Sequence, residues 1–168
     1  MHSAQIYHPD TNTWEDAPDA KVGRAYYSEA ILLPDGRVAT LGSNSTEGGD
    51  PNSWEQQIEI YKPEYWGKSR PVISVDPSQT VVAHGGSISF SSDKPLKWAE
   101  LVRPSAATHM MDPEQRIVDL PFTQNPSTNG VTATVDANKN LTPPGYYMLF
   151  GVDADNVPSV ASWVRVTQ

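Results

Sequence analysis

The chain contains the stretch Ser87-Ile88-Ser89-Phe90-Ser91 and, a few residues later, the stretch Trp98-Ala99-Glu100-Leu101-Val102, and in both the side-chain character alternates with a period of two. Successive side chains of a β-strand point to opposite faces of its sheet. A period of two therefore buries one face of the strand and leaves the other in water. The two stretches predict half-buried strands and indicate an all-β fold class.

The rest of the chain favours the same fold class, because helical periodicity is almost absent. The 15 prolines and 11 glycines recur too often for long helices. Short β-rich runs bounded by turn residues occur instead at 30–33, 37–41, 57–61, 71–75, 115–120, 130–135, 146–152 and 159–166. From Pro71 to Gln168 we count about seven strands at a spacing of ~8–12 residues, which is typical of an immunoglobulin-like β-sandwich.

One hairpin is explicit in the sequence Leu32-Leu33-Pro34-Asp35-Gly36-Arg37-Val38. Proline presets the φ angle of a turn, and Asp-Gly accepts left-handed backbone positions. Because Pro-Asp-Gly stands between two apolar runs, the segment predicts two antiparallel strands joined by a tight turn.

A boundary is expected near residue 70, at the seam Tyr65-Trp66-Gly67-Lys68-Ser69-Arg70-Pro71. Before the seam, Ile6-Tyr7-His8-Pro9 is followed 54 residues later by the similar Ile60-Tyr61-Lys62-Pro63. A unit that returns after ~50 residues is typical of the kelch repeat of β-propellers. Chance similarity of two short β-segments is the alternative. We therefore expect a kelch-like propeller remnant over residues 1–69 and a β-sandwich over residues 70–168.

Composition excludes several classes of protein. The chain has 168 residues, no cysteine and a formal net charge of −8. Without cysteine there is no disulfide scaffold, thiol nucleophile or thiolate metal site. The acidic balance argues against a nucleic-acid partner, which calls for a basic patch. No apolar run is long enough to predict a transmembrane helix, and no secretory leader is recognisable at Met1.

Several stretches together carry a resemblance to a known family. They are Arg24-Ala25-Tyr26-Tyr27-Ser28 with the 32–38 hairpin, Leu41-Gly42-Ser43-Asn44, Ala107-Thr108-His109 with Gln115-Arg116, Pro143-Pro144-Gly145-Tyr146-Tyr147-Met148-Leu149-Phe150, and Val157-Pro158-Ser159-Val160-Ala161-Ser162. In this order they resemble the last propeller blade and the C-terminal domain of the galactose oxidase and glyoxal oxidase family. The resemblance covers nearly the whole chain.

The resemblance implies a fold, a cofactor and a reaction. Members of this family are copper radical oxidases in which a seven-bladed propeller is followed by an immunoglobulin-like, early-set sandwich. Two tyrosines and two histidines hold the copper, and one of these tyrosines is cross-linked to a cysteine and becomes the radical. The enzymes convert an alcohol or an aldehyde, with oxygen, to the oxidised product and hydrogen peroxide. The resemblance also implies secretion or a place at the cell surface.

The family's site residues carry over to three positions. His109 matches the histidine ligand that a sandwich loop supplies, and Tyr26 matches the axial tyrosine, a copper ligand that also acts as base for the substrate hydroxyl. Tyr27 occupies the position of the second histidine ligand. The cross-linked cysteine and its tyrosine lie upstream in the family, and this chain has no cysteine. Without the resemblance, His109 would be an exposed loop residue and the tyrosine pair ordinary strand aromatics.

Two functions remain open at this point. The chain is either the C-terminal portion of a copper radical oxidase, inactive in isolation, or a non-catalytic module that binds carbohydrate or cell wall or serves a structural role. Tyr27 favours the second, and the retained His109 favours the first. Propeller strands without neighbours expose hydrogen-bonding edges. The expected partner is therefore an upstream propeller segment or another copy of the chain, with carbohydrate as a further candidate.

Overall fold

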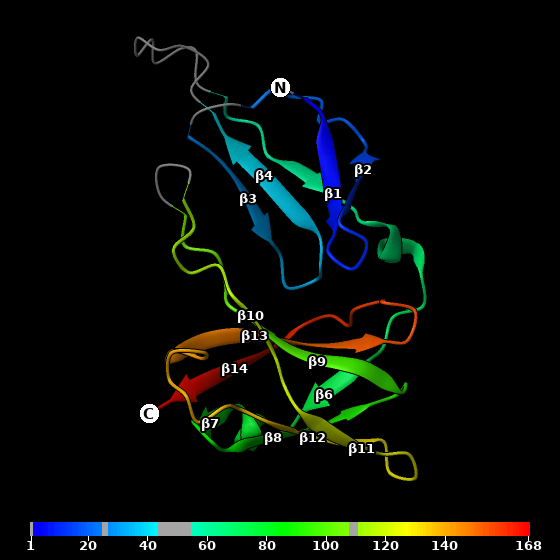
Figure 1. Ribbon diagram of the computed structural model, residues 1–168, viewed down its shortest axis with the longest axis vertical. Coiled ribbons are helices and arrows are strands. Elements are labelled where there is room, and N and C mark those ends of the chain that lie inside the picture. Colours follow the sequence, from blue (N-terminus) through cyan, green and yellow to red (C-terminus); the bar gives the residue numbers. More distant parts are fainter. Residues whose placement is uncertain (1, 25–26, 44–54, 108–110) are drawn as a thin grey trace.

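The computed structural model describes residues 2–24, 27–43, 55–107 and 111–168. In Figure 1 a smaller group of strands lies at one end of the molecule and two packed sheets at the other. The smaller group contains one two-stranded and one three-stranded antiparallel sheet. Its elements are β1 (Ala4–His8), β2 (Thr13–Ala17), β3 (Ser28–Leu32), β4 (Val38–Gly42) and β5 (Glu59–Tyr61), followed by the 3-10 helix η2 (Glu64–Gly67).

The second group is a β-sandwich, which confirms the predicted all-β class with an immunoglobulin-like domain. Its sheets have the strand orders β10-β9-β13-β14-β7 and β11-β12-β8-β6. The strands are β6 (Ile73–Val75), β7 (Val81–Ala83), β8 (Ser87–Ser92), β9 (Leu96–Val102), β10 (Ile117–Asp119), β11 (Phe122–Asn125), β12 (Gly130–Thr134), β13 (Gly145–Asp153) and β14 (Ser162–Thr167), and the 3-10 helix η3 (Pro77–Gln79) precedes β7. Among the described residues, no helix has the length and apolar character needed to cross a bilayer.

The sequence undercounts the strands of the sandwich. Nine strands, β6 to β14, occupy its described part, where about seven were expected. The additional two are β7, which pairs in parallel with β14, and β11, which pairs with β12. β7 has only three residues and β11 is largely polar. β7 is too short and β11 too polar to be recognised from sequence, and both form because backbone groups of a neighbouring strand need partners.

The predicted alternation of β8 and β9 is confirmed. Ile88 and Phe90 of β8 and Ala99 and Leu101 of β9 are buried in one core between the two sheets. The serines of β8 at 87, 89 and 91 face the opposite way and are exposed. Tyr147 closes the core, with its hydroxyl donating to the Pro143 carbonyl at 2.7 Å. This contact to backbone a few residues upstream is typical of the tyrosine corner of immunoglobulin-like sandwiches.

The Pro-Asp-Gly hairpin forms as predicted. Leu32 of β3 pairs with Val38 of β4. The amide of Gly36 donates to the Leu33 carbonyl at 2.8 Å, and Gly36 has a φ of 83°. A residue with a side chain rarely adopts that φ, so glycine is required at this point of the turn.

Both copies of the short repeat begin inside a strand. The first copy contributes to β1, and the second to β5. Their surroundings differ, since β1 pairs with β2 alone and β5 pairs with β4. The kelch-propeller interpretation of residues 1–69 and the domain boundary near residue 70 stay predictions.

The two sheets of the sandwich have different outer faces. On the four-stranded sheet the outer positions of β8 and β12 are hydroxyl residues, with Ser89 facing Thr132 across the strands. On the five-stranded sheet the outer positions of β13 include Met148 and Phe150, which are nevertheless buried. Leu32 from the hairpin packs on them. The strand β13 is therefore buried on both faces, which explains its nearly continuous apolar sequence.

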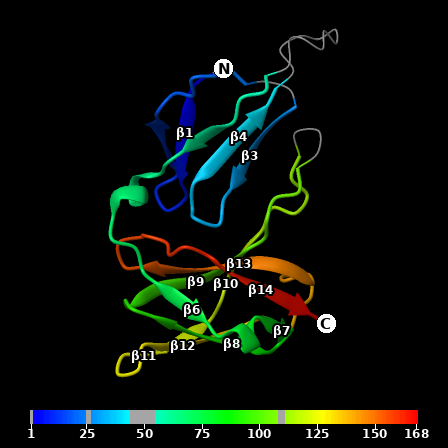
Figure 2. The same ribbon diagram turned by 180° about the vertical axis from the view of Figure 1, so that it is seen from behind.

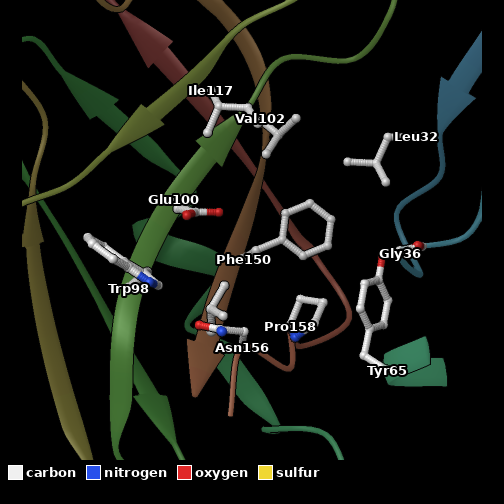
Figure 3. Close-up of a pocket in the computed structure, with 11 residues that line it drawn as sticks. Leu32, Gly36, Tyr65, Trp98, Glu100, Val102, Ile117, Phe150, Asn156 and Pro158 are labelled. Atoms are coloured by element: carbon white, nitrogen blue, oxygen red, sulfur yellow. Dashed lines mark hydrogen bonds between the residues drawn. The ribbon is translucent and has the colours of Figure 1, made fainter. Parts of the chain in front are cut away.

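A cavity of about 320 Å³ lies between the hairpin and this apolar face. Figure 3 shows Leu32, Gly36 and Tyr65 on one side and β9 and β13 on the other, with Trp98, Glu100 and Phe150 among the lining side chains. Glu100 faces Asp119 across the β9–β10 pair. Burial, and then the negative charge of Asp119, raise the pKa of Glu100 above its ordinary value.

Arg70 joins the two groups of strands. Its guanidinium donates to the carbonyls of Asp35 at 2.6 Å, Pro158 at 2.7 Å and Ser159 at 2.5 Å. It also lies 5.7 Å from the centre of the Tyr65 ring. One side chain thus connects the hairpin turn, the segment after β5 and the loop before β14.

Replacing Arg70 with Met should destabilise the chain by about 3 kcal/mol, because three partly buried carbonyls lose charge-assisted donors. Urea unfolding measures this change in the free energy of unfolding. Arg165→Met is the matched control: Arg165 also lies over a tyrosine ring, 5.8 Å from the centre of exposed Tyr146. An exposed contact of this kind contributes only ~0.5–1 kcal/mol. Equal losses for the two variants would contradict the role of Arg70.

Glu100→Gln should stabilise the chain at pH 7.5 and make little difference at pH 4. The pKa of Glu100 is higher in the folded than in the unfolded state, so its ionisation costs stability as the pH rises through that window, and protonation removes the cost below it. Urea unfolding at both pH values tests this, with exposed Glu64→Gln as control. A Glu100→Gln variant that follows wild type at both pH values would contradict the assignment.

Candidate functional site

Of the three positions that the resemblance assigns to a metal, the described residues include one, Tyr27. Tyr26 and His109 lie outside the described residues. Tyr27 directly precedes β3, has a φ of 58° and is 41% exposed.

The structure brings together the two chain segments that carry these positions. Figures 1 and 2 show the loop from β9 to β10 rising from the sandwich beside β3. Between this loop and the three-stranded sheet lies a polar cleft of about 450 Å³. Its lining residues are Arg24, Ser28, Glu29, Ala30, Thr40, Asp112 and Gln115. Arg24 and Ser28 flank the tyrosine pair in sequence, and Asp112 follows His109 by three residues. Side chains from both parts of the chain can therefore meet at this cleft.

Asp112 shapes the sandwich side of the cleft. Its Oδ1 accepts hydrogen bonds from the amides of Ala106 at 3.1 Å and Glu114 at 3.0 Å. Burial works against the ionised form of Asp112, but these and neighbouring hydrogen bonds outweigh it, so the pKa lies below its usual value. An ion pair between Arg103 and Glu114 closes the base of the same loop. The loop therefore has a defined conformation on either side of residues 108–110.

Arg24 and Glu59 were not predicted from the sequence as site residues. They form an ion pair with 3.5 Å between Nη2 and Oε2 at the three-stranded sheet, and Arg24 lines the cleft. The pair is invisible in the sequence, because the partners are far apart along the chain and come together through the three-stranded sheet β3-β4-β5. The single available signal was the place of Arg24 at the start of the tyrosine motif.

The side-chain types that the resemblance assigns to the metal fit copper in part. Copper(II) accepts imidazole nitrogen and anionic oxygen donors, and His109 with the two tyrosines offers one imidazole and two phenols. A phenol has a pKa near 10, so binding as phenolate needs help from the metal. Within the described ranges, no three His, Cys, Asp or Glu side chains are grouped closely enough to hold a metal. His109 and the two tyrosines therefore match only part of the ligand set that copper(II) accepts.

The remaining histidines lie in other contacts. His8 pairs with Glu15 at 3.0 Å on the β1–β2 hairpin. A ring nitrogen of His2 lies 3.0 Å from the Ala20 carbonyl. His84 lies 2.7 Å from the Thr142 carbonyl near the far end of the sandwich. None of the three lines the cleft.

Three tryptophans of the described residues are exposed. Trp14 is 64% exposed and lies against Tyr7, with 4.9 Å between ring centres. Trp98 and Trp163 are exposed on the outer face of the five-stranded sheet. Trp54 lies outside the described residues.

Comparison with known proteins identifies close relatives. The family model described as galactose oxidase-like, early set domain, matches residues 70–166. A galactose oxidase of Gibberella zeae is 35% identical over 174 residues, which cover 100% of this chain and 25% of that protein. The aldehyde oxidase GLOX of Vitis pseudoreticulata is 34% identical over 161 residues, which cover 86% of this chain and 30% of that protein.

A solved structure agrees with these relatives over the full length of the chain. A fungal alcohol oxidase of the AA5 family, determined in complex with copper, superposes with a TM-score of 0.88 at 26% identity. The match covers 100% of this chain and 36% of that one. The chain thus spans between a quarter and about a third of the relatives that it matches. From its sequence motifs, its sandwich and these matches, the chain belongs to the galactose oxidase-like family, the family of the copper radical oxidases.

Proposed function

We propose that this chain is the C-terminal portion of a copper radical oxidase that oxidises an alcohol or an aldehyde with oxygen and releases hydrogen peroxide. One observation carries the proposal: the segment that holds the tyrosine pair and the sandwich loop that holds His109 border the same polar cleft. The relatives named above support the reaction class.

In this proposal each matched residue has its own task. His109 and Tyr26 hold the copper, and Tyr26 also accepts the proton of the substrate hydroxyl. Tyr27 occupies the place of a second imidazole. Copper, when bound, supplies the redox chemistry. Asp112, three residues after His109, accepts hydrogen bonds from the amides of Ala106 and Glu114 and so fixes the described part of the loop around it.

The isolated chain should not turn over substrate. Oxidation of an alcohol to an aldehyde removes two electrons, and the second acceptor in this family is a tyrosine cross-linked to cysteine. This chain has no cysteine. A further segment, corresponding to the upstream part of the longer relatives, would have to supply the radical centre and the missing ligands.

Copper(II) should bind the isolated chain weakly, and His109→Ala should lower the affinity at least tenfold, because it removes the one matched imidazole. Isothermal titration measures the affinity. Every protein in the series carries His2→Ala, since a histidine beside the chain's amino group is itself a copper ligand. His8→Ala is the matched control, a surface histidine away from the cleft.

The same titration separates the two candidate functions. Equal affinity of wild type and the His109→Ala variant would remove His109 as a ligand and favour the non-catalytic alternative. If only the His8→Ala variant lost copper affinity, His109 would likewise be removed as a ligand and the non-catalytic alternative would be favoured.

We further propose that the outer face of the five-stranded sheet docks against the segment that precedes this chain in a longer protein. Residues 1–69 would be the closing part of that propeller. Ile117, Trp98 and Trp163 are exposed on this face, next to the buried contact of Phe150 with the hairpin. An apolar area continuous with an existing interface is costly to leave in water. The serine and threonine side chains on the outer face of the four-stranded sheet can stay in water without this free-energy cost.

Ile117→Glu should destabilise the longer protein by about 2 kcal/mol, because the charge would be buried there. In the isolated chain, where Ile117 is 64% exposed, the same change should cost less than about 0.5 kcal/mol. Thermal unfolding of both forms measures the difference. Thr132→Glu, on the outer face of the four-stranded sheet, should change the stability of the longer protein and of the isolated chain only slightly. Equal effects of Ile117→Glu in the two forms would overturn the docking proposal, and self-association of the isolated chain through this face would point to a second copy instead.

A further inference from the structure

Three residues with positive φ gather where β3 begins and β4 ends. Tyr27 has a φ of 58°, Gly42 of 74° and Ser43 of 138°, and the last pair of the ladder, Ser28 with Gly42, lies between them. A non-glycine residue in the left-handed region costs ~1–2 kcal/mol. Such residues persist only where the surroundings hold them, and they concentrate at functional sites. The strand end next to the cleft is therefore held under strain.

One source of this constraint is the close approach of two backbones. A Cβ atom built on Gly42 would lie 2.3 Å from the carbonyl oxygen of Tyr27. No side chain fits that space, so glycine at position 42 lets the Tyr27 carbonyl lie against β4. The approach limits the rotations that are open to Tyr27.

Arg24 ties the chain before Tyr27 to the same strand end. Its Nη1 donates to the Gly42 carbonyl at 2.6 Å, and its Nη2 donates to the Gln57 carbonyl at 2.9 Å. The Arg24 side chain is only 10% exposed. A planar guanidinium with two fixed acceptors cannot shift without losing one of them.

Glu59 on β5 completes the attachment from the other side. Its carboxylate accepts hydrogen bonds from the amides of Lys21 at 2.7 Å and Val22 at 3.2 Å, besides its ion pair with Arg24. The segment from Lys21 to Arg24 is therefore held at both backbone and side chain. The chain leaves this segment at a fixed point and has to reach β3 within three residues.

We propose that Arg24 and Glu59 are positioning residues that impose the left-handed backbone at Tyr27 and thereby set the direction of the side chain at that position. Rotation of φ to a negative value would redirect the Cα–Cβ bond. The clamp, meaning Arg24 with Glu59, is built from protein contacts alone and precedes any metal. Its relevance to copper rests on the proposed function, whereas its effect on the backbone does not.

The backbone effect is tested by comparing Ala and Gly at position 27. At an ordinary position Gly is less stable than Ala, whereas at a left-handed position Gly is favoured. With the clamp intact, we expect Tyr27→Gly to have a folding equilibrium constant about fivefold larger than that of Tyr27→Ala. In an Arg24→Gln background this preference for Gly should disappear or reverse, because the backbone at residue 27 can then return to a negative φ.

Urea unfolding of the four proteins gives the required equilibrium constants. In the matched control series, the second background carries Arg165→Gln instead of Arg24→Gln. Arg165 lies on the outer face of the sandwich, so this change should leave the preference for Gly at position 27 unchanged. If Arg24→Gln fails to fold, Glu59→Gln serves as the milder release of the clamp. The same preference for Gly in both backgrounds, or a preference for Ala with the clamp intact, would overturn the proposal.

A second measurement asks whether the clamp positions a ligand. Tyr27→His in the His2→Ala chain should raise copper(II) affinity about tenfold with the clamp intact and leave it unchanged with Arg24→Gln. Titration gives the affinity, and the electron paramagnetic resonance spectrum reports an added nitrogen ligand. An equal gain in both backgrounds would overturn the positioning role. No gain in either would refute the copper role of position 27 in the proposed function, and the Ala and Gly comparison would then decide the clamp by itself.

Discussion

The partly buried guanidinium of Arg70 is the contact on which the arrangement of the two strand groups depends. It donates hydrogen bonds to three carbonyls, one from the hairpin turn and two from the loop before β14. Because the hairpin is held there, Leu32 reaches Phe150 and Met148 and buries the outer face of β13. The same attachment places the three-stranded sheet beside the 103–116 loop, and so creates the polar cleft.

The contrast between the two outer faces of the sandwich follows from this arrangement. Serine and threonine on the four-stranded sheet are suited to water, whereas Trp98, Trp163 and Ile117 on the other sheet form an apolar surface around the hairpin contact. A surface of that kind is typical of an interface. It agrees with a chain that spans only a quarter to about a third of the relatives that it matches.

The polar cleft lies beside an irregular part of the fold. Tyr27, Gly42 and Ser43 have positive φ, next to the partly buried Arg24–Glu59 pair. Regular strands could not place a tyrosine and a loop from the sandwich at one point, because strand side chains alternate on a fixed spacing. The irregular backbone is therefore part of how such a site can be built.

By itself, the sequence determined the all-β class, the half-buried strands β8 and β9 and the Pro-Asp-Gly turn, because these depend on side-chain periodicity and on φ preferences of neighbouring residues. Its motifs also indicated the family and, by resemblance, the candidate metal positions Tyr26, Tyr27 and His109. The short strands β7 and β11, the roles of Arg70 and Glu59 and the exposure of three tryptophans were decided only by the tertiary structure. Each depends on partners far away along the chain, and no local pattern specifies which distant carbonyl or strand edge a residue will meet.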